Sequence, residues 1–348
     1  VAQVLSLGTE RVKDALYELL VQTLADMGEH ISAIYERNDV KIRELEGMEE
    51  YKGFWAGAGL RTDLSGVTEI TENGIKYTVD YINGQKTGFF LDQKYNRQAI
   101  RRIAEGRTVL DCFTHTGSFA LNSAAAGAKS VTAVDISADA IEMTRRNAEQ
   151  NGFTNVEFRQ ADVFDLLTEL YRAGGHPYDF IILDPPAFTK SSSTVRAAER
   201  GYKEINLKAM RLLPRGGYLA TCSCSHFMTE TLFRHMLHDA AADAGVSLRQ
   251  IEARRQAPDH PILWNVPETE YLKFYILQVV YYAAYRKRPA PGNRRAALQA
   301  RNAPGKRARG QRDVPLRDTR SCPPHRVRRN AGGVPCALRR AQDMRPPA

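Results

Sequence analysis

The chain lacks several features that would place a protein in a well-known class. It has no run of about 18 apolar residues, so we expect no membrane-spanning helix and no membrane partner. Its five cysteines are odd in number and follow no disulfide-framework spacing, which favours a reducing, cytoplasmic setting. Cys222 and Cys224 form a C-x-C pair, but no second Cys/His cluster completes a zinc site, so we expect no metal.

Aromatic residues are also absent from the last part of the chain, residues 286–348. This segment holds 18 of the 49 Lys and Arg, 3 of the 40 Asp and Glu, and 9 of the 16 Pro. Because it cannot bury enough apolar surface to order itself, we predict a disordered Arg/Pro-rich tail over residues 285–348. The tail is either a basic arm for RNA phosphates or an out-of-frame translation of GC-rich DNA, and we favour the second. The rest of the chain is slightly acidic despite the overall charge of +9.

Residues 1–87 are predicted to form a small α+β domain that has no recognisable chemistry and that either faces RNA or links to the rest. The expected elements are strands over 1–8 and 31–35, helices over 10–27 and 39–50, and a hairpin of strands 67–71 and 75–82. The hairpin is predicted because its connection contains Asn73-Gly74, a strong short signal for a tight β-turn.

From residue 88 to 284 the pattern changes to strands that alternate with helices. Strands are expected over 107–112, 130–135, 156–159, 180–184 and 217–222, with an edge pair over 248–252 and 271–280. Helices are expected over 92–103, 118–126, 137–150, 163–172, 196–213 and 229–243. This alternation predicts an α/β fold with a doubly wound, Rossmann-like parallel sheet.

A tight turn at Thr116-Gly117 follows the first of these strands, and Ser118 is expected to cap the next helix. The second strand ends in Asp135, 18 residues after Gly117, close to the roughly 20 residues typical of an acid that reaches a ribose hydroxyl. The turn lacks the further glycines that a pyrophosphate requires. The cofactor should therefore carry adenosine without a diphosphate, which points to S-adenosylmethionine.

Polar residues follow the carboxyl ends of five predicted strands, where ligands of such sheets bind. Asp135 is expected to accept the ribose hydroxyls, Asp162 the adenine amino group, and Asp111 the methionine amino group. Each is otherwise an ordinary acid at a strand end. His115 is interpreted as a spacer in the turn. The full predicted cofactor set is Arg97, Asp111, Phe113, Thr114, Gly117, Asp135, Ile136, Asp162, Val163 and Asp184.

The sequence Asp184-Pro185-Pro186 predicts a rigid turn, because two prolines restrict the backbone. Such a turn would present Asp184 to a planar amino group, and Phe188 could stack on a base. The alternative is a structural loop with a packed phenylalanine. The predicted substrate-binding residues are Pro185, Pro186, Phe188 and Lys190.

Cys224 and Asp184 are the predicted catalytic residues. Carbon 5 of a pyrimidine is a poor nucleophile until a thiolate adds to carbon 6, so its methylation needs a cysteine. Strand alternation places Cys222 and Cys224 on the same side, and we favour Cys224 because it lies further beyond the sheet edge. The alternative is a pair of ordinary buried cysteines.

Several motifs together carry a resemblance to a known family. They are Asp111–Phe119, Val134–Ser137, Asp184–Phe188, Cys222–Ser225 and Pro267–Lys273, with Gly88–Arg97 leading into the first strand. Over about residues 1–280 the chain resembles class I S-adenosylmethionine-dependent methyltransferases, and within them the RlmI-like cytosine-C5 methyltransferases of bacterial 23S ribosomal RNA. The resemblance implies Cys224 as nucleophile, the Asp-Pro-Pro turn facing the target cytosine, and ribosomal RNA as partner.

Two departures and two alternatives accompany the resemblance. Family members usually start with a small RNA-binding PUA domain, and none precedes Val1, so we expect a truncated chain. The tail has no family counterpart.

One alternative is an amino-nitrogen methyltransferase of RNA, in which an aromatic residue typically follows Asp/Asn-Pro-Pro at once, whereas Ala187 intervenes here. The other is a non-catalytic RNA-binding assembly factor. A homodimer is left open.

Overall fold

The structure is a computed structural model that describes residues 1–189 and 191–280. The predictions for Lys190 and for the basic tail lie outside the described residues.

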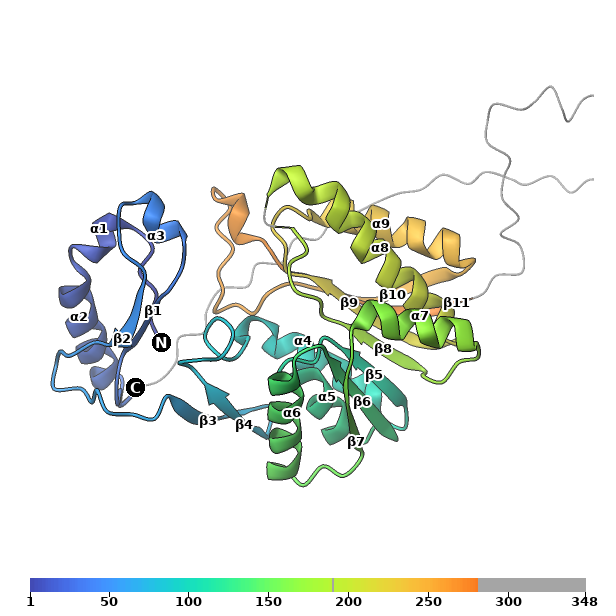
Figure 1. Ribbon diagram of the computed structural model, residues 1–348, viewed down its shortest axis with the longest axis horizontal. Helices are drawn as coiled ribbons and strands as arrows, with labels where there is room; N and C mark the ends of the chain where they lie inside the picture. Colours follow the sequence, from blue (N-terminus) through green and yellow to red (C-terminus); the bar gives the residue numbers. More distant parts are fainter. Residues whose placement is uncertain (190, 281–348) are drawn as a thin grey trace, which may run out of the picture. The chain divides into compact units, whose positions relative to one another are not determined.

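A seven-stranded sheet in the order β10-β11-β9-β8-β5-β6-β7 organises the larger part of the described chain (Figure 1). Its strands are β5 (Thr108–Cys112), β6 (Ser130–Asp135), β7 (Val156–Gln160), β8 (Phe180–Leu183), β9 (Tyr218–Ser223), β10 (Ser247–Arg254) and β11 (Lys273–Val280). Strands β5 to β9 pair in parallel, whereas β11 is antiparallel to β9 and β10. The predicted doubly wound sheet with its edge pair is confirmed.

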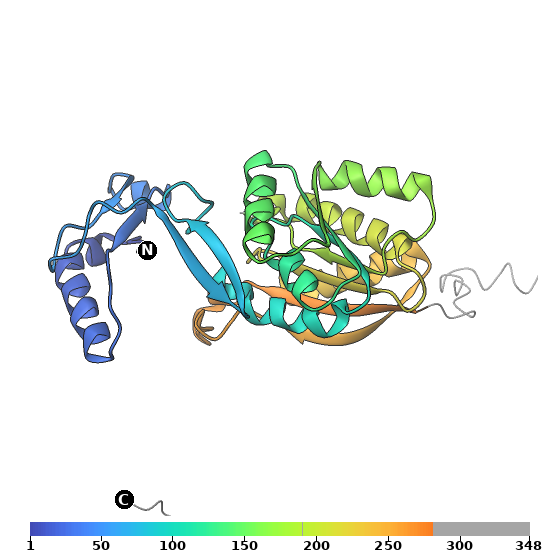
Figure 2. The ribbon, with the colours of Figure 1, turned by 90° about the horizontal axis from the view of Figure 1, so that it is seen from below.

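Helices cover both faces of this sheet (Figures 1 and 2). On one face are α4 (Lys94–Ala104), α5 (Ser118–Ala125) and α6 (Ala138–Gln150), and on the other α7 (Val163–Ala173), α8 (Val195–Leu212) and α9 (Glu230–Ala244). Successive residues of one strand enter opposite clusters: Val109 packs on one face and Leu110 on the other. Because both faces are covered, the central strand β8 is a continuous buried apolar run, Phe180–Leu183.

The strand order reverses between β5 and β8, which lie side by side although three helices separate them in the chain. At such a point the connections after the two strands leave towards opposite faces, and a crevice opens at their carboxyl ends. The fold therefore predicts that a ligand binds beside the residues that follow β5, β6 and β8.

The amino-terminal part differs from its prediction in several elements. It contains α1 (Leu7–Glu10), α2 (Lys13–Asp26), β1 (Tyr35–Asn38), α3 (Ile42–Leu45) and β2 (Tyr51–Phe54). The strand expected over 1–8 is wrong, since only an isolated bridge forms there, between Ala2 and Glu36. The helix expected over 39–50 ends at Leu45, shortly before Gly47 with φ +70°, and β2 then pairs antiparallel with β1.

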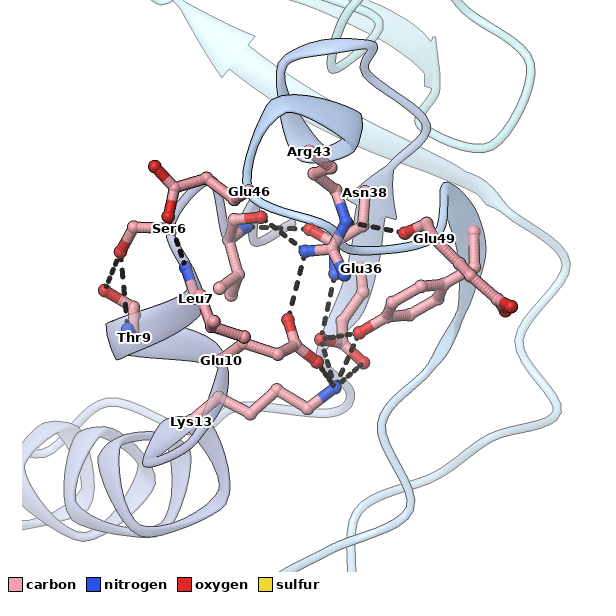
Figure 3. A network of polar contacts seen from close by, with 12 residues as sticks. Ser6, Leu7, Thr9, Glu10, Lys13, Glu36, Asn38, Arg43, Glu46 and Glu49 are labelled. Carbon is pink, nitrogen blue, oxygen red and sulfur yellow. Dashed lines mark hydrogen bonds and ion pairs between the residues drawn. The ribbon is translucent and has the colours of Figure 1, made fainter.

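A buried polar network explains why the elements of the amino-terminal part were predicted wrongly (Figure 3). All residues of β1 are buried although three are polar. The Glu36 carboxylate accepts hydrogen bonds from Lys13 Nζ at 3.1 Å, Tyr17 Oη at 3.3 Å, Tyr51 Oη at 2.8 Å and Asn38 Nδ2 at 3.2 Å. A buried carboxylate is tolerated only with such partners, and no apolar alternation reveals it.

The predicted hairpin is confirmed as β3 (Val67–Glu72) and β4 (Ile75–Asp80). Both turn residues, Asn73 and Gly74, have positive φ, as a tight hairpin turn requires. Its buried side chains Ile75, Tyr77 and Val79 belong to the same apolar cluster as residues of α4 and α5.

Asn147 of α6 and Asn151, the residue that caps the carboxyl end of this helix, fix β4. Asn147 Oδ1 accepts from the Thr78 N–H at 2.9 Å, and Asn151 binds both backbone groups of Lys76. Asn147 also donates to the Thr116 carbonyl at 3.0 Å. One helix therefore ties the hairpin to the turn after β5.

Candidate active site

The turn after β5 has a strained backbone that approaches α6 closely. Gly117 has φ +83° and occupies the cap position before α5, so the prediction that Ser118 caps the helix is wrong. A Cβ atom at Gly117 would lie 2.6 Å from Thr144 Cγ2, so only glycine fits. Phe113 and His115 also have positive φ. Such strain in non-glycine residues is typical of functional loops.

Asp111 supports this turn from behind. Its Oδ2 accepts from Thr114 Oγ1 at 2.6 Å and from the Ala120 N–H at 2.9 Å, whereas its Oδ1 is buried without a hydrogen-bond partner among the described residues. Burial raises the pKa of Asp111 to about 7. The side chain does not line the neighbouring cavity, so its contact with a methionine amino group stays a prediction.

Asp135 lies at the carboxyl end of β6 and lines the cavity. Its two oxygens accept from the His115 and Ser137 N–H groups, each at 3.0 Å. A carboxylate has about four acceptor positions, so two remain for ligand hydroxyls. The neighbouring Ile136 is 64% exposed and could cover an apolar ring.

Asp162 and Val163 have structural roles in this fold. Asp162 caps α7 by accepting from the Phe164 N–H at 2.7 Å and the Asp165 N–H at 3.2 Å. Val163 is buried in the core, and neither residue lines the cavity. Their predicted contact with adenine stays a prediction.

The cavity has a volume of about 650 Å³, within the range of roughly 300–1,000 Å³ typical of small-molecule sites. One side is formed by the residues that follow β5, β6 and β8, where the strand order reverses. Residues between Asn83 and Gln93 also line the cavity, and the cofactor prediction missed them. Their signal in the sequence was the stretch from Gly88 to Arg97, which carried a family resemblance but in which only Arg97 was assigned to the cofactor.

Asp92 is the acceptor that this missed segment contributes. It is buried and lines the cavity; its Oδ2 accepts from Tyr271 Oη at 2.8 Å, and its Oδ1 has no partner among the described residues. An unpaired buried acceptor is costly unless a ligand supplies the donor. Asp92 thus fits a ligand that carries an N–H or O–H group.

Arg97, a predicted cofactor residue, lines the cavity but is held by protein groups. Its guanidinium is 1% exposed and forms a two-point ion pair with Glu72, with N–O distances of 2.5 and 2.7 Å. It also donates to the Phe90 carbonyl at 2.8 Å. Arg97 therefore connects the cavity-lining segment around Phe90 to Glu72 of the hairpin.

Asp184 and Cys222 are joined directly. Asp184 Oδ1 accepts from the Cys222 thiol at 2.9 Å and from Gln93 Nε2 at 3.0 Å. Burial raises the pKa of Asp184 to about 6, so the carboxyl group titrates just below neutral pH. Cys222 is fully buried, and burial raises its thiol pKa well above the ordinary value. It acts here as a hydrogen-bond donor to Asp184.

Cys224, in contrast, is partly exposed and lines the cavity together with Asp184, Pro185 and Pro186. Its sulfur lies 4.0 Å from the Pro185 carbonyl oxygen. Burial, and next the charge of Asp184, raise its pKa to about 11, while Lys86 lowers it. The structure therefore brings both predicted catalytic residues to one cavity, with Cys224 rather than Cys222 facing it.

Phe188 packs against other aromatic rings instead of lining the cavity. Its ring centroid lies 4.6 Å from that of Tyr202 and 5.8 Å from that of Phe164. Its stacking on a base stays a prediction.

Within residues 1–189 and 191–280, no three His, Cys, Asp or Glu side chains are placed to hold a metal ion. In the same part of the chain, every helix is too short or too polar to span a membrane.

The sequence profile of the S-adenosylmethionine-dependent methyltransferases matches residues 21–291. The chain belongs to this family. Ribosomal RNA large subunit methyltransferase I of Aeromonas salmonicida is 44% identical over 280 residues, which cover 80% of this chain and 68% of the relative. The protein of the same name from Pseudoalteromonas translucida is 43% identical over 282 residues, with coverages of 80% and 68%.

Solved structures agree with the fold of this methyltransferase. The crystal structure of SMU.776 complexed with SAH has a TM-score of 0.65 and 23% identity, covering 78% of this chain and 67% of that one. Trm5b from Pyrococcus abyssi has a TM-score of 0.53 and 17% identity, with coverages of 77% and 70%.

S-adenosylmethionine is thereby confirmed as the cofactor, and the cavity fits it. Asp135 has acceptor positions left that could bind ribose hydroxyls beside the exposed Ile136, and Asp92 has an oxygen, without a partner among the described residues, that could bind an amino group. When bound, S-adenosylmethionine supplies an electrophilic methyl group.

Proposed function

We propose that this methyltransferase acts on 23S ribosomal RNA and methylates carbon 5 of a cytosine through a covalent bond to Cys224. The RNA class is supported by the names of its relatives, which are large-subunit ribosomal RNA methyltransferases. The chemistry is supported by one observation above all: Cys224 shares the cavity with Asp184 and the two prolines. An enzyme of ribosomal RNA would work in the cytoplasm.

In the proposed reaction the Cys224 thiolate attacks carbon 6 of the cytosine. The electron pair of the 5,6 double bond then makes carbon 5 nucleophilic, so carbon 5 would bond to the methyl group as the bond from that methyl to the sulfonium sulfur breaks and a neutral thioether leaves. A base removes the proton from carbon 5, the double bond reforms, and the carbon–sulfur bond breaks to return the thiolate. The target base must first leave its stack, which costs a few kcal/mol.

Asp184 is proposed to hold the cytosine ring. Gln93 and Cys222 fix its Oδ1 from the protein side, so the carboxyl group is oriented before the base arrives. A carboxyl group with a pKa of about 6 carries a proton in a fraction of molecules near neutral pH. It can therefore share a proton with ring nitrogen 3 as negative charge develops there during thiolate addition.

The competing function is methylation of an amino nitrogen, which would use the Asp-Pro-Pro turn and no thiol. The discriminating experiment is methyl transfer to unmodified 23S RNA, with mass spectrometry of the digested nucleosides, for the full chain and for C224A. We expect 5-methylcytosine with the wild type and a loss of at least about 1,000-fold with C224A. A methylated exocyclic amine, or full activity of C224A, would contradict the proposal. Absence of methyl transfer despite cofactor binding would favour an assembly factor.

A further inference from the structure

The connection between β10 and β11, residues 255–272, lies at the same edge of the sheet as the candidate active site. Arg254, the last residue of β10, pairs with Phe274 near the start of β11. Lys273, the first residue of β11, pairs with Ser223, the last residue of β9. The connection therefore leaves and rejoins the sheet where the parallel strands end, and it projects from there as the orange segment of Figures 1 and 2.

Several hydrogen bonds attach this connection to the wall of the cavity. The Ala257 N–H donates to the Asp92 carbonyl oxygen at 2.8 Å, and Tyr271 Oη donates to the Asp92 carboxylate, also at 2.8 Å. Lys273 Nζ donates to the Tyr271 carbonyl at 2.7 Å and to the Ser225 carbonyl at 2.6 Å, in the loop that follows β9. The connection is thus fixed at its start to a residue that lines the cavity, and at its end to that residue and to the loop after β9.

The tip of the connection is a hydrogen-bonded turn that carries Trp264. The Val266 N–H donates to the Leu263 carbonyl at 2.9 Å, which closes the turn around Trp264. The Thr269 hydroxyl accepts from the Leu263 N–H at 2.8 Å and donates to the Val266 carbonyl at 2.7 Å. Hydrogen bonds therefore restrain the backbone on both sides of Trp264.

Trp264 is 98% exposed, the largest exposed fraction among the large apolar side chains of the described residues. The other tryptophan of the chain, Trp55, is buried and donates its indole N–H to Asp14 at 2.8 Å. Tryptophan is highly buried on average, and where it lies at a surface it is enriched in binding sites. A fully exposed indole on a restrained turn beside a cavity therefore indicates a binding surface.

The size of this surface favours a nucleobase over a protein partner. Within residues 255–272, the exposed large apolar side chains are Trp264 and its neighbour Leu263. A stable protein interface buries about 800 Å² on each partner, several times what one indole and one leucine offer. One aromatic ring, in contrast, is enough to stack on one unpaired base, which is a common contact of single-stranded RNA.

The charges of the connection favour stacking over phosphate binding. Arg255 is the one Lys or Arg in the sequence of residues 255–272. Its guanidinium is engaged by Glu230 at 3.4 Å and by Glu270 at 2.9 Å. RNA would therefore contact this segment through the face of a base.

We propose that Trp264 stacks on an unpaired base of the RNA strand that carries the target nucleotide. A strand that delivers a base to the cavity has to cross this edge of the sheet. Because the target base leaves its stack, the face of an adjacent base becomes free for a new stacking partner. The proposal rests on the RNA substrate proposed above, but not on the attack by Cys224.

The first test compares methyl transfer to unmodified 23S RNA for the full chain and for W264A, W264F and L263A. W264A removes the ring, and W264F keeps a smaller one. L263A is the matched control, because Leu263 is the neighbouring exposed apolar residue. Calorimetry with S-adenosylmethionine and urea unfolding show whether a variant keeps the cofactor site and the fold.

We expect W264A to raise the KM for RNA about tenfold and W264F to raise it less than about threefold. The kcat and the affinity for S-adenosylmethionine should stay within about twofold of the wild type, and L263A should stay within about twofold in all respects. A wild-type KM for W264A would overturn the proposal, and so would an equal rise in KM for L263A.

A second test detects the stacking itself through tryptophan fluorescence, since a stacked base quenches the emission of an indole. The probe is a single-stranded oligocytidylate of about ten nucleotides, a length within the range that single-strand sites cover. We expect it to quench the wild type but not W264F, in which only the buried Trp55 emits. An RNA duplex of the same length should quench less, because its base faces are internal. Equal quenching of wild type and W264F, or equal quenching by the duplex, would contradict stacking by Trp264.

The two proposals fail in different ways. If C224A still methylates RNA while W264A raises the KM, the stacking stands and the carbon-5 mechanism is wrong. If C224A is inactive and W264A has a wild-type KM, Cys224 is the nucleophile and the RNA strand takes another path. If 23S RNA accepts no methyl group and oligocytidylate does not quench the wild type, both proposals are wrong.

Discussion

Buried acids in two regions of this protein differ in whether the protein itself supplies all of their hydrogen-bond partners. In the amino-terminal part, Glu36 accepts from Lys13, Tyr17, Asn38 and Tyr51, all within the protein. At and near the cavity, in contrast, one oxygen of Asp92, which lines it, and one oxygen of the neighbouring Asp111 have no hydrogen-bond partner in the described part of the chain.

A network in which the buried polar atoms all have hydrogen-bond partners stabilises the fold, whereas a buried acceptor without a partner at a cavity can bind a donor of a ligand. The sequence alone does not distinguish the two, since both consist of acids among apolar residues. The comparison predicts which substitutions should affect stability and which should affect binding or catalysis.

The largest expected effect on stability comes from breaking the completed network. E36A leaves Lys13 and two tyrosines without their shared acceptor and should lower the free energy of unfolding by about 3 kcal/mol. Urea unfolding of wild type and variant measures this. Cofactor affinity of the folded fraction should stay unchanged; a loss of affinity would mean that this network also serves the cavity.

A smaller effect is expected at the turn after β5, which lines the cavity. G117A must adopt φ +83° and place a Cβ atom 2.6 Å from Thr144 Cγ2, so the turn must move. Strain of this kind costs about 1–3 kcal/mol, and we expect S-adenosylmethionine binding to weaken at least about tenfold in calorimetry. The matched control is G152A, since Gly152 also has positive φ (+70°) but has no atom within 4 Å of an added Cβ. Equal affinities for both variants would contradict the assigned role of the turn.

Substitutions of Asp135 and of Asp162 distinguish a role in cofactor binding from a role in capping a helix. D135N should weaken cofactor binding about tenfold, because an amide replaces part of the carboxylate that we predict accepts the ribose hydroxyls. D162A should instead cost about 1 kcal/mol of stability through the lost cap of α7. If D162A also weakens binding beyond what its instability explains, the predicted adenine contact of Asp162 is correct.

The smallest expected effect is a pH dependence of stability. The pKa of Asp111 is raised to about 7 in the folded protein, so the folded state binds its proton more tightly than the unfolded state. Stability due to this group is therefore present below pH 4 and is lost as pH rises towards 7. D111N should reduce this loss by an amount on the order of 1 kcal/mol between pH 5 and 7.5, in urea unfolding. An unchanged pH dependence would place Asp111 in a more solvated setting.

The methyltransferase sheet could be predicted because its signals are local. Apolar runs such as Phe180–Leu183 are buried on both faces; Asp135 is the last residue of its strand, and Asp184 follows its strand directly in the chain. The opposite side of the cavity could not be predicted in this way. Asp92 precedes α4, and its place beside the cavity depends on tertiary packing. The contact of Lys273 with the loop of Cys224 depends on tertiary packing in the same way.

The prediction of the amino-terminal elements failed for a related reason. Its strand β1 buries Glu36 and Asn38, whereas the sequence pattern favoured strands over the neighbouring segments 1–8 and 31–35. Buried polar residues are recognised only when their partners are known, and Lys13 and Tyr51 come from other elements.

The central claim, a covalent bond from Cys224 to the target base, is tested most directly with 23S RNA that contains 5-fluorocytosine. Fluorine at carbon 5 cannot leave as a proton, so the reaction should stop with the RNA attached to the protein. We predict a complex that survives denaturation, requires S-adenosylmethionine, forms with C222A, and is absent with C224A. Attachment to another residue, or C5-methylation without any attachment, would contradict the account.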